Sequence, residues 1–472
     1  MSKLAPLTTE KIIHFKNSFS FPNIWCVAYA QFAFNEVRDG THDSPKQSEK
    51  GVPLITSKNL TNGFIDFTNT KIISLEDHLE ISKRSGVSTG DLLFSMIGTI
   101  GNVAPVPENT HFSVKNVGLF RKNDSLLNRR FSFHWLRSHP YQKYLGDHKR
   151  GGNQKFVSLG VLRQSPIPIP PLCEQKVIAD KLDTLLAQVE NTKARLERIP
   201  QILKRFRQSV LAAAVSGRLT EEWRSGDTPE QDFKKLGDAG VTVKTGPFGS
   251  ALHKSDYVYG GIPVINPMHI SEGIITPSES MTISQQKYLS LEAWHLRKGD
   301  IVVGRRGEMG RAAVVGSDED QLCGTGSMLL RAGKNALPKY LEIILRSPTA
   351  VSYFNSASVG STMVNLNQKV IKNLEVYFPP LKEQTEIVRR VDQLFAHADR
   401  IEQQVNQALA QVNNLIQSIL AKAFRGELTE QWRKDNPELI SGENSAEALL
   451  ERIKAERAAK APAKRTRKKA TA

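Results

Sequence analysis

The sequence predicts an α+β protein with two globular domains in a pseudo-twofold arrangement, joined by two long antiparallel coiled-coil helices. Three observations predict this fold class: a gapless internal repeat, a heptad pattern of apolar residues in both copies of it, and short apolar runs broken by Gly, Pro, Asn and Ser elsewhere. The expected parts are residues 1–165 (first globular domain), 166–224 (first helical spacer), 225–375 (second globular domain), 376–433 (second helical spacer) and 434–472 (a helix and a basic tail).

The internal repeat is long and in strict register. Residues 170–224 begin PPLCEQKVIADKLDTLLAQVE and end RQSVLAAAVSGRLTEEWR, whereas residues 379–433 begin PPLKEQTEIVRRVDQLFAHAD and end IQSILAKAFRGELTEQWR. The two segments align without a gap at an offset of 209 residues, with 20 identities in 55 positions. Shorter echoes at an offset of 209 or 210 include GTIG at 98–101 and GEMG at 307–310. The chain therefore contains one scaffold twice, with different surfaces in between.

Both copies of the repeat predict a coiled-coil helix, because apolar residues recur at alternating spacings of four and three. The predicted seam consists of Ile178, Leu182, Leu185, Val189, Leu196, Leu203, Ile387, Val391, Leu394, Ile401, Val405 and Val412. Each helix is expected to begin at a Pro-Pro pair, since the first turn has no intrahelical partner for its N–H groups. Pro200, whose counterpart is Leu409, is expected to break or kink the first helix near residues 198–199. Ordinary core packing also produces apolar stripes, but the length of this pattern in two copies favours a paired coil.

The regions outside the repeat have a different texture. Short apolar runs such as VPLI, DLLFSMI, IPVI and GDIVVG lie between turn-forming residues, which is typical of short strands and a few helices in an α+β domain. Near the end of the chain, residues 446–459 predict one more helix. The final segment KAPAKRTRKKATA is basic and of low complexity, and we expect it to be disordered.

The composition favours a polyanionic partner. The chain has 64 Lys and Arg against 48 Asp and Glu, which gives a net charge of +16 and a pI near 9.6. Such a balance suits nucleic acid or an anionic membrane face, although part of it can be general solvation. Three widely spaced cysteines make a disulfide framework or a zinc site improbable and fit a reducing cytoplasm. We expect a cytoplasmic protein, because the sequence has no signal-peptide pattern and no apolar run of roughly 18 residues.

Common catalytic motifs are missing from the sequence. It contains no GxxxxGK[ST] phosphate loop, no HExxH, no GxSxG, and no Asn-Pro-Pro-aromatic tetrapeptide of an adenine methyltransferase. Its eleven histidines form no evident pair or triad. We therefore expect no catalytic residue, no metal and no cofactor in this chain.

Basic, Gly-rich loops instead recur at matching places in the two globular regions. Arg and Lys suit guanine edges and phosphates, Asn and Gln suit adenine edges, and glycine lets backbone N–H groups approach a phosphate. An exposed charged loop is often merely solvated, so the argument depends on the recurrence of the loops. The candidate DNA-binding residues are Thr41, His42, Thr99, Lys149, Arg150, Asn153, Gln154, Lys155, Lys244, Phe248, Ser250, Arg305, Arg306, Glu308, Ser361, Thr362, Asn365, Asn367 and Lys369.

These motifs resemble those of a known protein family. PPLxEQ, the heptad helix and GxLTExWR, each occurring twice, are similar to the repeated regions of type I restriction-modification specificity subunits, most of all those of the IA group. GPFGSALHKSDYVYGGIPVI and GDIVVGRRGEMGRA resemble the start and middle of that family's target-recognition domains. The first globular region departs from the pattern, with DGTHDSP in place of the GPFGS element, which fits a different half-site.

The resemblance implies a division of labour between subunits. Each globular domain would read one half of a split double-stranded DNA target, and the helices would set the distance between the halves; about 33 residues give a rod of roughly 50 Å. One copy of the chain would carry two methyltransferase subunits and two restriction-translocase subunits. S-adenosylmethionine, ATP and magnesium would bind to those partners, which would methylate adenine or cleave DNA.

Two other functions stay open on the sequence. A self-contained DNA adenine methyltransferase would need a cofactor-binding glycine motif and a catalytic tetrapeptide. A coiled-coil scaffold that binds only proteins would show no sequence preference on DNA.

Overall fold

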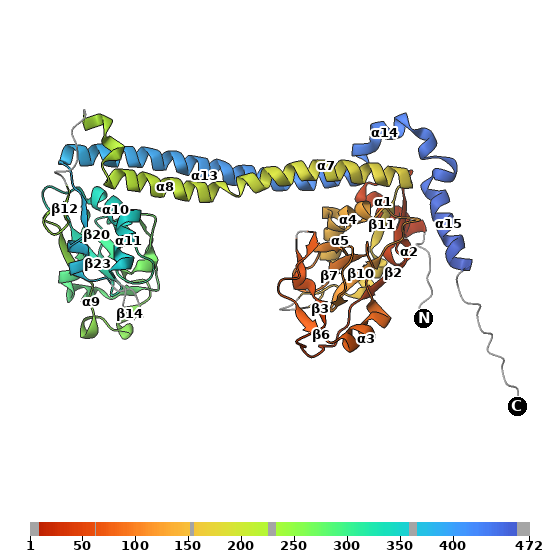
Figure 1. Ribbon diagram of the computed structural model, residues 1–472, viewed down its shortest axis with the longest axis horizontal. Helices are drawn as coiled ribbons and strands as arrows, with labels where there is room; N and C mark the ends of the chain where they lie inside the picture. Colours follow the sequence, from red (N-terminus) through yellow and green to blue (C-terminus); the bar gives the residue numbers. More distant parts are fainter. Residues whose placement is uncertain (1–8, 62, 152–154, 225–232, 358–365, 460–472) are drawn as a thin grey trace. The chain divides into compact units, whose positions relative to one another are not determined.

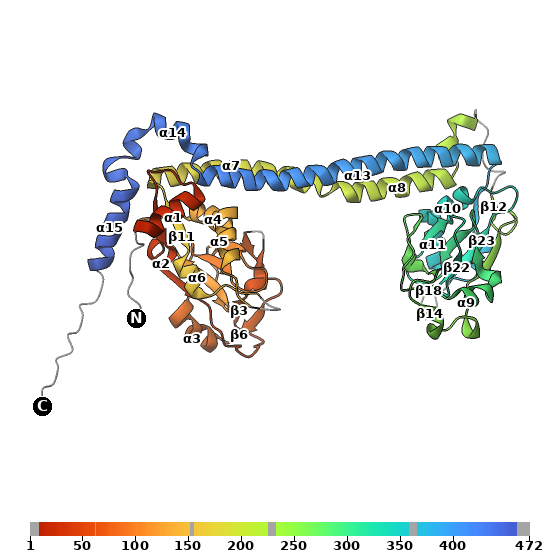
Figure 2. The same ribbon diagram turned by 180° about the vertical axis from the view of Figure 1, so that it is seen from behind.

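The computed structural model describes residues 9–61, 63–151, 155–224, 233–357 and 366–459 (Figures 1 and 2). The chain forms two compact units: unit 1 comprises residues 1–194 and 409–472, and unit 2 comprises residues 195–408. No helix of the described residues is both long and apolar enough to cross a membrane. Each unit combines a globular α+β domain with part of the long helices, so the predicted fold class is confirmed.

Unit 1 holds the first globular domain, the first long helix and the C-terminal elements. Its helices are α1 (Thr9–Phe19), α2 (Ala30–Ala33), α3 (Leu75–Ser85), α4 (Arg129–Arg137), α5 (His139–Asp147), α6 (Leu159–Gln164), α7 (Leu172–Leu196), α14 (Glu430–Asp435) and α15 (Ala446–Ala459). Its strands are β1 (Cys26–Tyr29), β2 (Glu36–Asp39), β3 (Val52–Ile55), β4 (Leu60–Thr61), β5 (Phe64–Ile65), β6 (Lys71–Ile73), β7 (Leu92–Ser95), β8 (Val103–Pro105), β9 (Ser113–Val114), β10 (Val117–Arg121) and β11 (Pro166–Ile169).

Unit 2 holds the second globular domain and α8, the part of the first helical segment that follows its interruption. Its helices are α8 (Ile199–Val215), α9 (Gln285–Leu289), α10 (Pro338–Arg346), α11 (Pro348–Ser356) and α12 (Gln368–Lys372). Its strands are β12 (Phe233–Lys235), β13 (Thr242–Thr245), β14 (Tyr257–Val258), β15 (Ile262–Ile265), β16 (Ile270–Ser271), β17 (Ile274–Ile275), β18 (Thr282–Ile283), β19 (His295–Leu296), β20 (Ile301–Gly304), β21 (Ala312–Val314), β22 (Gln321–Cys323), β23 (Ser327–Arg331) and β24 (Glu375–Tyr377). Helix α13 (Leu381–Phe424) begins in unit 2 and ends in unit 1.

The same sheet topology recurs in the two units. An antiparallel four-stranded sheet has the order β2-β10-β7-β8 in unit 1 and β13-β23-β20-β21 in unit 2, and a two-stranded sheet pairs β1 with β11 and β12 with β24. The echo Gly-Asp at 90–91 and 299–300 has the same structural role in both. Gly90 and Gly299 have φ values of 89° and 88°, and each following aspartate accepts a backbone N–H three residues before it.

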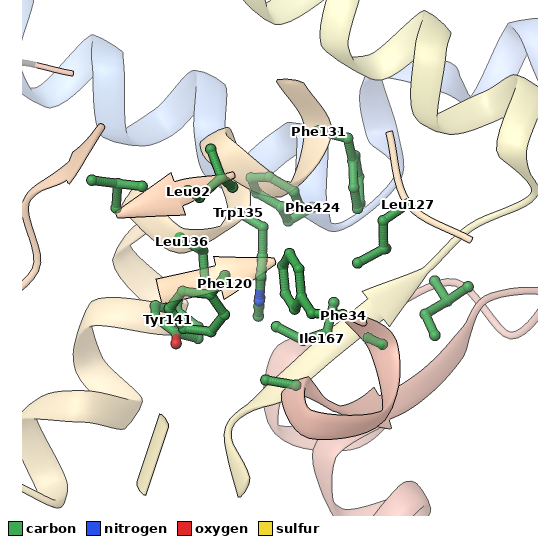
Figure 3. Close-up of a cluster of buried hydrophobic side chains, with 14 of the residues drawn as sticks. Phe34, Leu92, Phe120, Leu127, Phe131, Trp135, Leu136, Tyr141, Ile167 and Phe424 are labelled. Carbon is green, nitrogen blue, oxygen red and sulfur yellow. The ribbon is translucent and has the colours of Figure 1, made fainter. Parts of the chain in front are cut away.

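Each four-stranded sheet packs on helices through an apolar core that also includes residues of α13. In unit 1, Phe424 at the end of α13 lies 5.0 Å from Trp135 and 5.5 Å from Phe131 of α4 between ring centroids (Figure 3). In unit 2, Ile387 and Val391 of α13 belong to the core cluster that contains α8 and α10. The globular domain and the coil of each unit therefore share one continuous core.

The helical segments pair antiparallel within each unit. In unit 1, α7 packs on the C-terminal part of α13, as both views show, and Lys181 donates to the carbonyl of Leu428 at 2.7 Å. In unit 2, α8 packs on the N-terminal part of α13, and Arg390 donates to the carbonyl of Leu219 at 2.9 Å. The first helix is interrupted between Leu196 and Ile199, with Pro200 in the first turn of α8, as its sequence predicts.

Burial differs along the predicted seam. Its buried members are Ile178, Leu182, Val189, Leu203, Ile387, Val391 and Val405, and its half-buried members are Leu185, Leu196, Leu394, Ile401 and Val412. Leu186, outside the predicted seam, is more deeply buried than Leu185, because the domain core lies against that side of α7.

The glutamate of each PPLxEQ motif closes the coil against the other repeat. Glu174, fully buried at the start of α7, accepts hydrogen bonds from Thr429 and Arg433, both at 2.6 Å, and from the Trp25 indole at 3.0 Å. Thr429 and Arg433 belong to the GxLTExWR motif of the second repeat. A buried carboxylate is costly without partners, and here both of its oxygens have them.

The equivalent arrangement occurs in unit 2 with the roles of the repeats exchanged. Glu383 accepts from Thr220 at 2.6 Å, from Arg224 at 2.5 Å and from the Tyr377 hydroxyl at 2.9 Å. We call each set a clasp: Glu174 with Thr429 and Arg433, and Glu383 with Thr220 and Arg224. Three residues before each threonine, a glycine in the left-handed conformation ends the helix, with φ of 76° at Gly217 after α8 and 73° at Gly426 after α13.

The glutamine of each PPLxEQ motif fastens the globular domain to the helix. Gln175 donates to the carbonyls of Leu126 and Pro170, both at 2.9 Å, and accepts from the N–H of Asn128 at 2.7 Å. Gln384 makes the equivalent bonds to Asn335, Pro379 and Leu337. The two residues of the Glu-Gln pair thus have different tasks, one toward the coil and one toward the domain.

Unit 1 carries an element without a repeat, helix α15, which spans the residues where the sequence predicts it. Leu449 and Ile453 join the unit 1 core, and Arg457 donates to the carbonyl of Phe34 at 2.7 Å. The basic segment that follows residue 459 lies outside the described residues.

Removing a clasp glutamate should loosen one unit only. We expect Glu174→Ala to lower the free energy of unfolding of unit 1 by about 3–5 kcal/mol, because it leaves the Arg433 guanidinium without its buried partner. Hydrogen exchange followed by mass spectrometry should show faster exchange in α7 and the end of α13, with unit 2 unchanged, and Glu383→Ala should give the mirror result. The exposed Glu430→Ala serves as the control, and equal loosening of both units would contradict the expectation.

Candidate nucleic-acid interface

The candidate loops meet at one end of each four-stranded sheet. In unit 1, antiparallel register brings the end of β2 (Asp39), the start of β10 (Val117) and the turn between β7 and β8 to the same edge. In unit 2, register brings together the end of β13 (Thr245), the start of β23 (Ser327) and the turn between β20 and β21. We call these two places the reading edges.

The central turn of each reading edge has the same backbone in both units. Gly98 and Gly307 have φ of 74° and 77°, and Gly101 and Gly310 have φ of 105° and 85°. A Cβ at Gly98 or Gly307 would meet no atom within 4 Å, so these two glycines are needed for the backbone conformation and leave the backbone open to a ligand.

A second loop lies beside this turn in each unit. In unit 1, the N–H of Val157 donates to the carbonyl of Met96, and in unit 2 the N–H of Leu366 donates to the carbonyl of Arg305, both at 2.9 Å. These pairs occupy equivalent positions, since both partners differ by 209 in number. In each unit the structure therefore places the central turn and the second loop side by side, whereas the sequence showed only that each loop has a counterpart in the other unit.

The side chains at the unit 1 edge are partly held by neighbours. His42 is exposed, with Nδ1 2.8 Å from the Asn116 side-chain oxygen and Nε2 3.1 Å from the buried Asp39 carboxylate. Thr41 donates its N–H to Val114, while its side chain accepts from the N–H of Asp43. These contacts fix the orientation of the loop that follows β2.

The second loop of unit 1 is a hairpin with cations at its base. Arg150 and Phe156 exchange two backbone hydrogen bonds of 3.0 and 2.9 Å, and Lys149, Arg150 and Lys155 are exposed. Thr99 is exposed in the adjoining turn, and its carbonyl accepts from the Ser95 hydroxyl. Asn153 and Gln154 lie outside the described residues.

The unit 2 edge carries more arginine. Arg306 is exposed and Arg305 half-buried; burial and the neighbouring Arg306 lower the pKa of Arg305, whose guanidinium still stays charged at neutral pH. The predicted contact Glu308 is exposed but pairs with Arg311 at 2.9 Å, and Arg311 also donates to the carbonyl of Pro267. The turn therefore presents arginine and glutamate side by side.

The remaining candidate DNA-binding residues of unit 2 differ in their exposure and in their contacts with neighbouring residues. Phe248 is 70% exposed beyond the end of β13, and the Lys244 ammonium lies 5.1 Å from the centre of the Trp294 ring. The Asn367 side chain accepts from the N–H of Val370 and caps α12, on which Lys369 is exposed. The Ser250 side chain, Ser361, Thr362 and Asn365 lie outside the described parts.

Asn116 of the unit 1 reading edge was not among the sequence-based candidates, whereas Gln368 lies in a candidate loop of unit 2. Asn116 orients His42 and has a left-handed backbone with φ of 53°, and Gln368 donates to the Thr245 hydroxyl at 3.3 Å. An asparagine between two apolar strands is a weak turn signal, and its pairing with His42 across 74 positions has no local signature.

No metal site is present among the residues that the structure describes, since no three His, Cys, Asp or Glu side chains lie close enough together to hold an ion. The reading edges themselves present cations, amides, hydroxyls and open backbone. Such groups bind phosphates and base edges by hydrogen bonds and charge.

Comparison with known proteins gives one consistent family. The model for the type I restriction modification DNA specificity domain matches residues 40–201 and 231–411. The chain is 38% identical over 463 residues to the type I restriction enzyme EcoKI specificity subunit of Escherichia coli (strain K12), covering 95% of this chain and 98% of that one. It is 40% identical over 442 residues to the EcoBI specificity subunit of Escherichia coli, covering 87% and 93% of the two chains.

Solved structures agree on the fold. A chain from a structure described as showing complex assembly and conformational transition of the type I R-M system superposes with a TM-score of 0.66 at 21% identity, covering 86% of this chain and 99% of that one. The HsdS subunit from Thermoanaerobacter tengcongensis superposes with a TM-score of 0.52 at 20% identity, covering 86% and 98%. The chain therefore belongs to the family of type I restriction-modification specificity subunits, and it is a DNA-recognition subunit with no catalytic role of its own.

Proposed function

We propose that the chain reads a bipartite, asymmetric double-stranded DNA target, one half at each reading edge. The observation that carries this proposal is the equivalence of the two edges: the same turn, with the same left-handed glycines, presents Ile97 and Thr99 in unit 1 but Arg306 and Glu308 in unit 2. Because the two turns have the same backbone conformation, each reading edge is held in the same way against its own sheet. Because their side chains differ, the two edges read different bases.

The long helices set the distance between the two half-sites in this proposal. Helix α13 has 44 residues, which corresponds to a rise of about 66 Å. Because it contributes to the apolar core of both units, it is a continuous connection between the domains. A length of this order exceeds one turn of duplex DNA, about 34–36 Å, so a stretch of unread base pairs separates the half-sites.

The catalytic partners complete the proposed activity. One copy of this chain docks two methyltransferase subunits and two restriction-translocase subunits, which bring S-adenosylmethionine, ATP and magnesium. Adenine methylation or ATP-dependent cleavage then occurs on those partners, at DNA selected by this chain. The similarity to the EcoKI relative, a specificity subunit of a type I restriction enzyme, supports such an assembly.

Methylome sequencing tests the bipartite target directly. Single-molecule sequencing of DNA from cells that carry this system should show adenine methylation in a split motif with an unread gap of fixed length. Exchange of residues 225–375 for the equivalent domain of another family member should change one half of the motif and leave the other half and the gap intact. A change in both halves would refute independent reading by the two domains.

The spacer role predicts a separate result. Deleting one heptad from each long helix, at positions that face each other, removes about 10.5 Å of coil. The methylated motif should then keep both halves but have a shorter gap, with the same sequencing as the measurement. Loss of half-site preference with the gap unchanged would contradict the role of the coil as a spacer.

The arginines of the unit 2 reading edge should affect one half-site. We expect Arg306→Ala to weaken binding of the cognate target by about 1–3 kcal/mol and to relax specificity at one position if the side chain reads a base, and Arg305→Ala likewise. Competition binding with single base-pair substitutions measures both effects. Lys334→Ala is the matched control, since Lys334 is exposed beyond the opposite end of β23. Equal losses for Lys334→Ala would contradict a base contact.

A further inference from the structure

The middle of the coil carries cations that neither the fold nor the reading edges use. Arg195, Arg198, Lys204 and Arg205 are exposed, and none has an ion-pair or side-chain hydrogen-bond partner within the part of the chain that the structure describes. We call these four residues the central cationic patch. Residues 195–205 contain one acidic residue, Glu197, which leaves a net charge of +3.

Other arginines of the same coil are neutralised. Arg207, two residues beyond the patch, is 2.6 Å from Asp399 and 2.8 Å from Glu402 of α13. Arg389 and Arg390 both pair with Glu386 at 2.7 Å. These three arginines differ from the patch cations in having ion-pair partners.

The opposite helix offers the patch no counter-charge. Glu402 is the last acidic residue of α13 before a stretch without any charged residue from 403 to 421. In the part of this stretch that belongs to unit 2, Gln403, Gln404 and Gln407 are exposed. Amides do not neutralise arginine, and they can themselves donate to phosphate oxygens.

The first turn of α8 does not offset the charge of the patch. Arg198 is its N-cap and makes no side-chain cap hydrogen bond, and the first turn holds no acidic residue.

The patch also breaks the repeat. The equivalents of Arg195, Arg198, Lys204 and Arg205 in the second repeat are Gln404, Gln407, Asn413 and Asn414, all uncharged. The scaffold therefore forms a helix at these positions without cations. A partner that binds twice, once on each repeat, would need equivalent surfaces, so the patch fits a ligand that meets the coil once.

We propose that the central cationic patch binds the phosphate backbone of the unread duplex between the two half-sites. This inference rests on the proposed bipartite target. Arg195 and Arg205 are ten residues apart, which corresponds to about 15 Å at helical rise, and each strand of duplex DNA carries about four phosphates over that length. Contacts of this kind need no base sequence, which suits base pairs that no reading edge touches.

The test replaces patch cations by the amides of the second repeat. The variant Arg198→Gln/Arg205→Asn carries the residues that the equivalent helix already tolerates. The matched control, Lys176→Thr/Lys422→Ala, removes two exposed helical lysines and installs their own repeat equivalents. Each is assembled as the full chain with its methyltransferase subunits and titrated with target duplexes whose spacer phosphates are native or replaced by neutral methylphosphonates.

Wild type and control should bind the neutral-spacer duplex on the order of 10-fold more weakly than the native one, with a salt dependence shallower by about 0.9 per lost contact. The patch variant should bind the native duplex more weakly than wild type and lose less affinity on the neutral spacer than wild type and control, because two of the four patch cations are gone, while discrimination between half-site bases stays unchanged. An equal effect of spacer neutralisation on patch variant and control would overturn the inference, as would loss of methyltransferase co-purification with intact DNA binding, which would make the patch a protein contact.

The failure of the bipartite target is distinguishable from the failure of this inference. If base substitutions in either half-site leave wild-type binding unchanged, the proposed function is wrong. If half-site substitutions weaken binding but neutral spacer phosphates do not, only the role of the patch is wrong.

Discussion

The buried carboxylates of Glu174 and Glu383 connect three parts of each unit: the start of one long helix, the turn that ends the other, and a residue of the globular domain. Each carboxylate is held by a threonine and an arginine from the opposite repeat and by Trp25 or Tyr377 from the domain. Because an unpartnered buried charge costs several kcal/mol, all three parts must be in place together. The antiparallel pairing of the helices follows from this requirement, since each motif finds its partner only in the other repeat.

The motif residues and the reading edges have separate roles, which explains why the scaffold repeats while the surfaces differ. Motif residues satisfy buried charges, helix ends and the carbonyls that Gln175 and Gln384 bind. The reading edges depend on the scaffold only for their backbone, through glycines whose φ values agree between the units. Side chains on such turns can change with little effect on the core, which is how one architecture accommodates two different readers.

The sequence predicted the fold class, the repeat and the interruption at Pro200, because heptad periodicity and proline act locally. The separate tasks of glutamate and glutamine in PPLxEQ were not predictable, since their partners lie 255 and 47 positions away. Periodicity also assigned Leu185 to the seam, whereas the deeper residue is Leu186, because the domain core covers one flank of α7 and heptads describe only the partner helix. At the reading edges, the sequence indicated the loops but not the pairing of His42 with Asn116, which lie 74 positions apart and are brought together by strand register.

The two repeats agree most at their ends and least at their centre. Between Arg195 and Leu211 the helix of the first repeat is interrupted, from Leu196 to Ile199, whereas the equivalent residues of α13 continue without interruption. The charge differs in the same interval, with cations in the first repeat and amides in the second. The clasps do not require either difference, since they lie at the opposite ends of the helices. If the coil served only as a spacer between two domains, its two helices would not need to differ in charge. The proposed contact of one helix with the DNA backbone accounts for the asymmetry at the centre of the coil, since such a contact needs cations on one helix only.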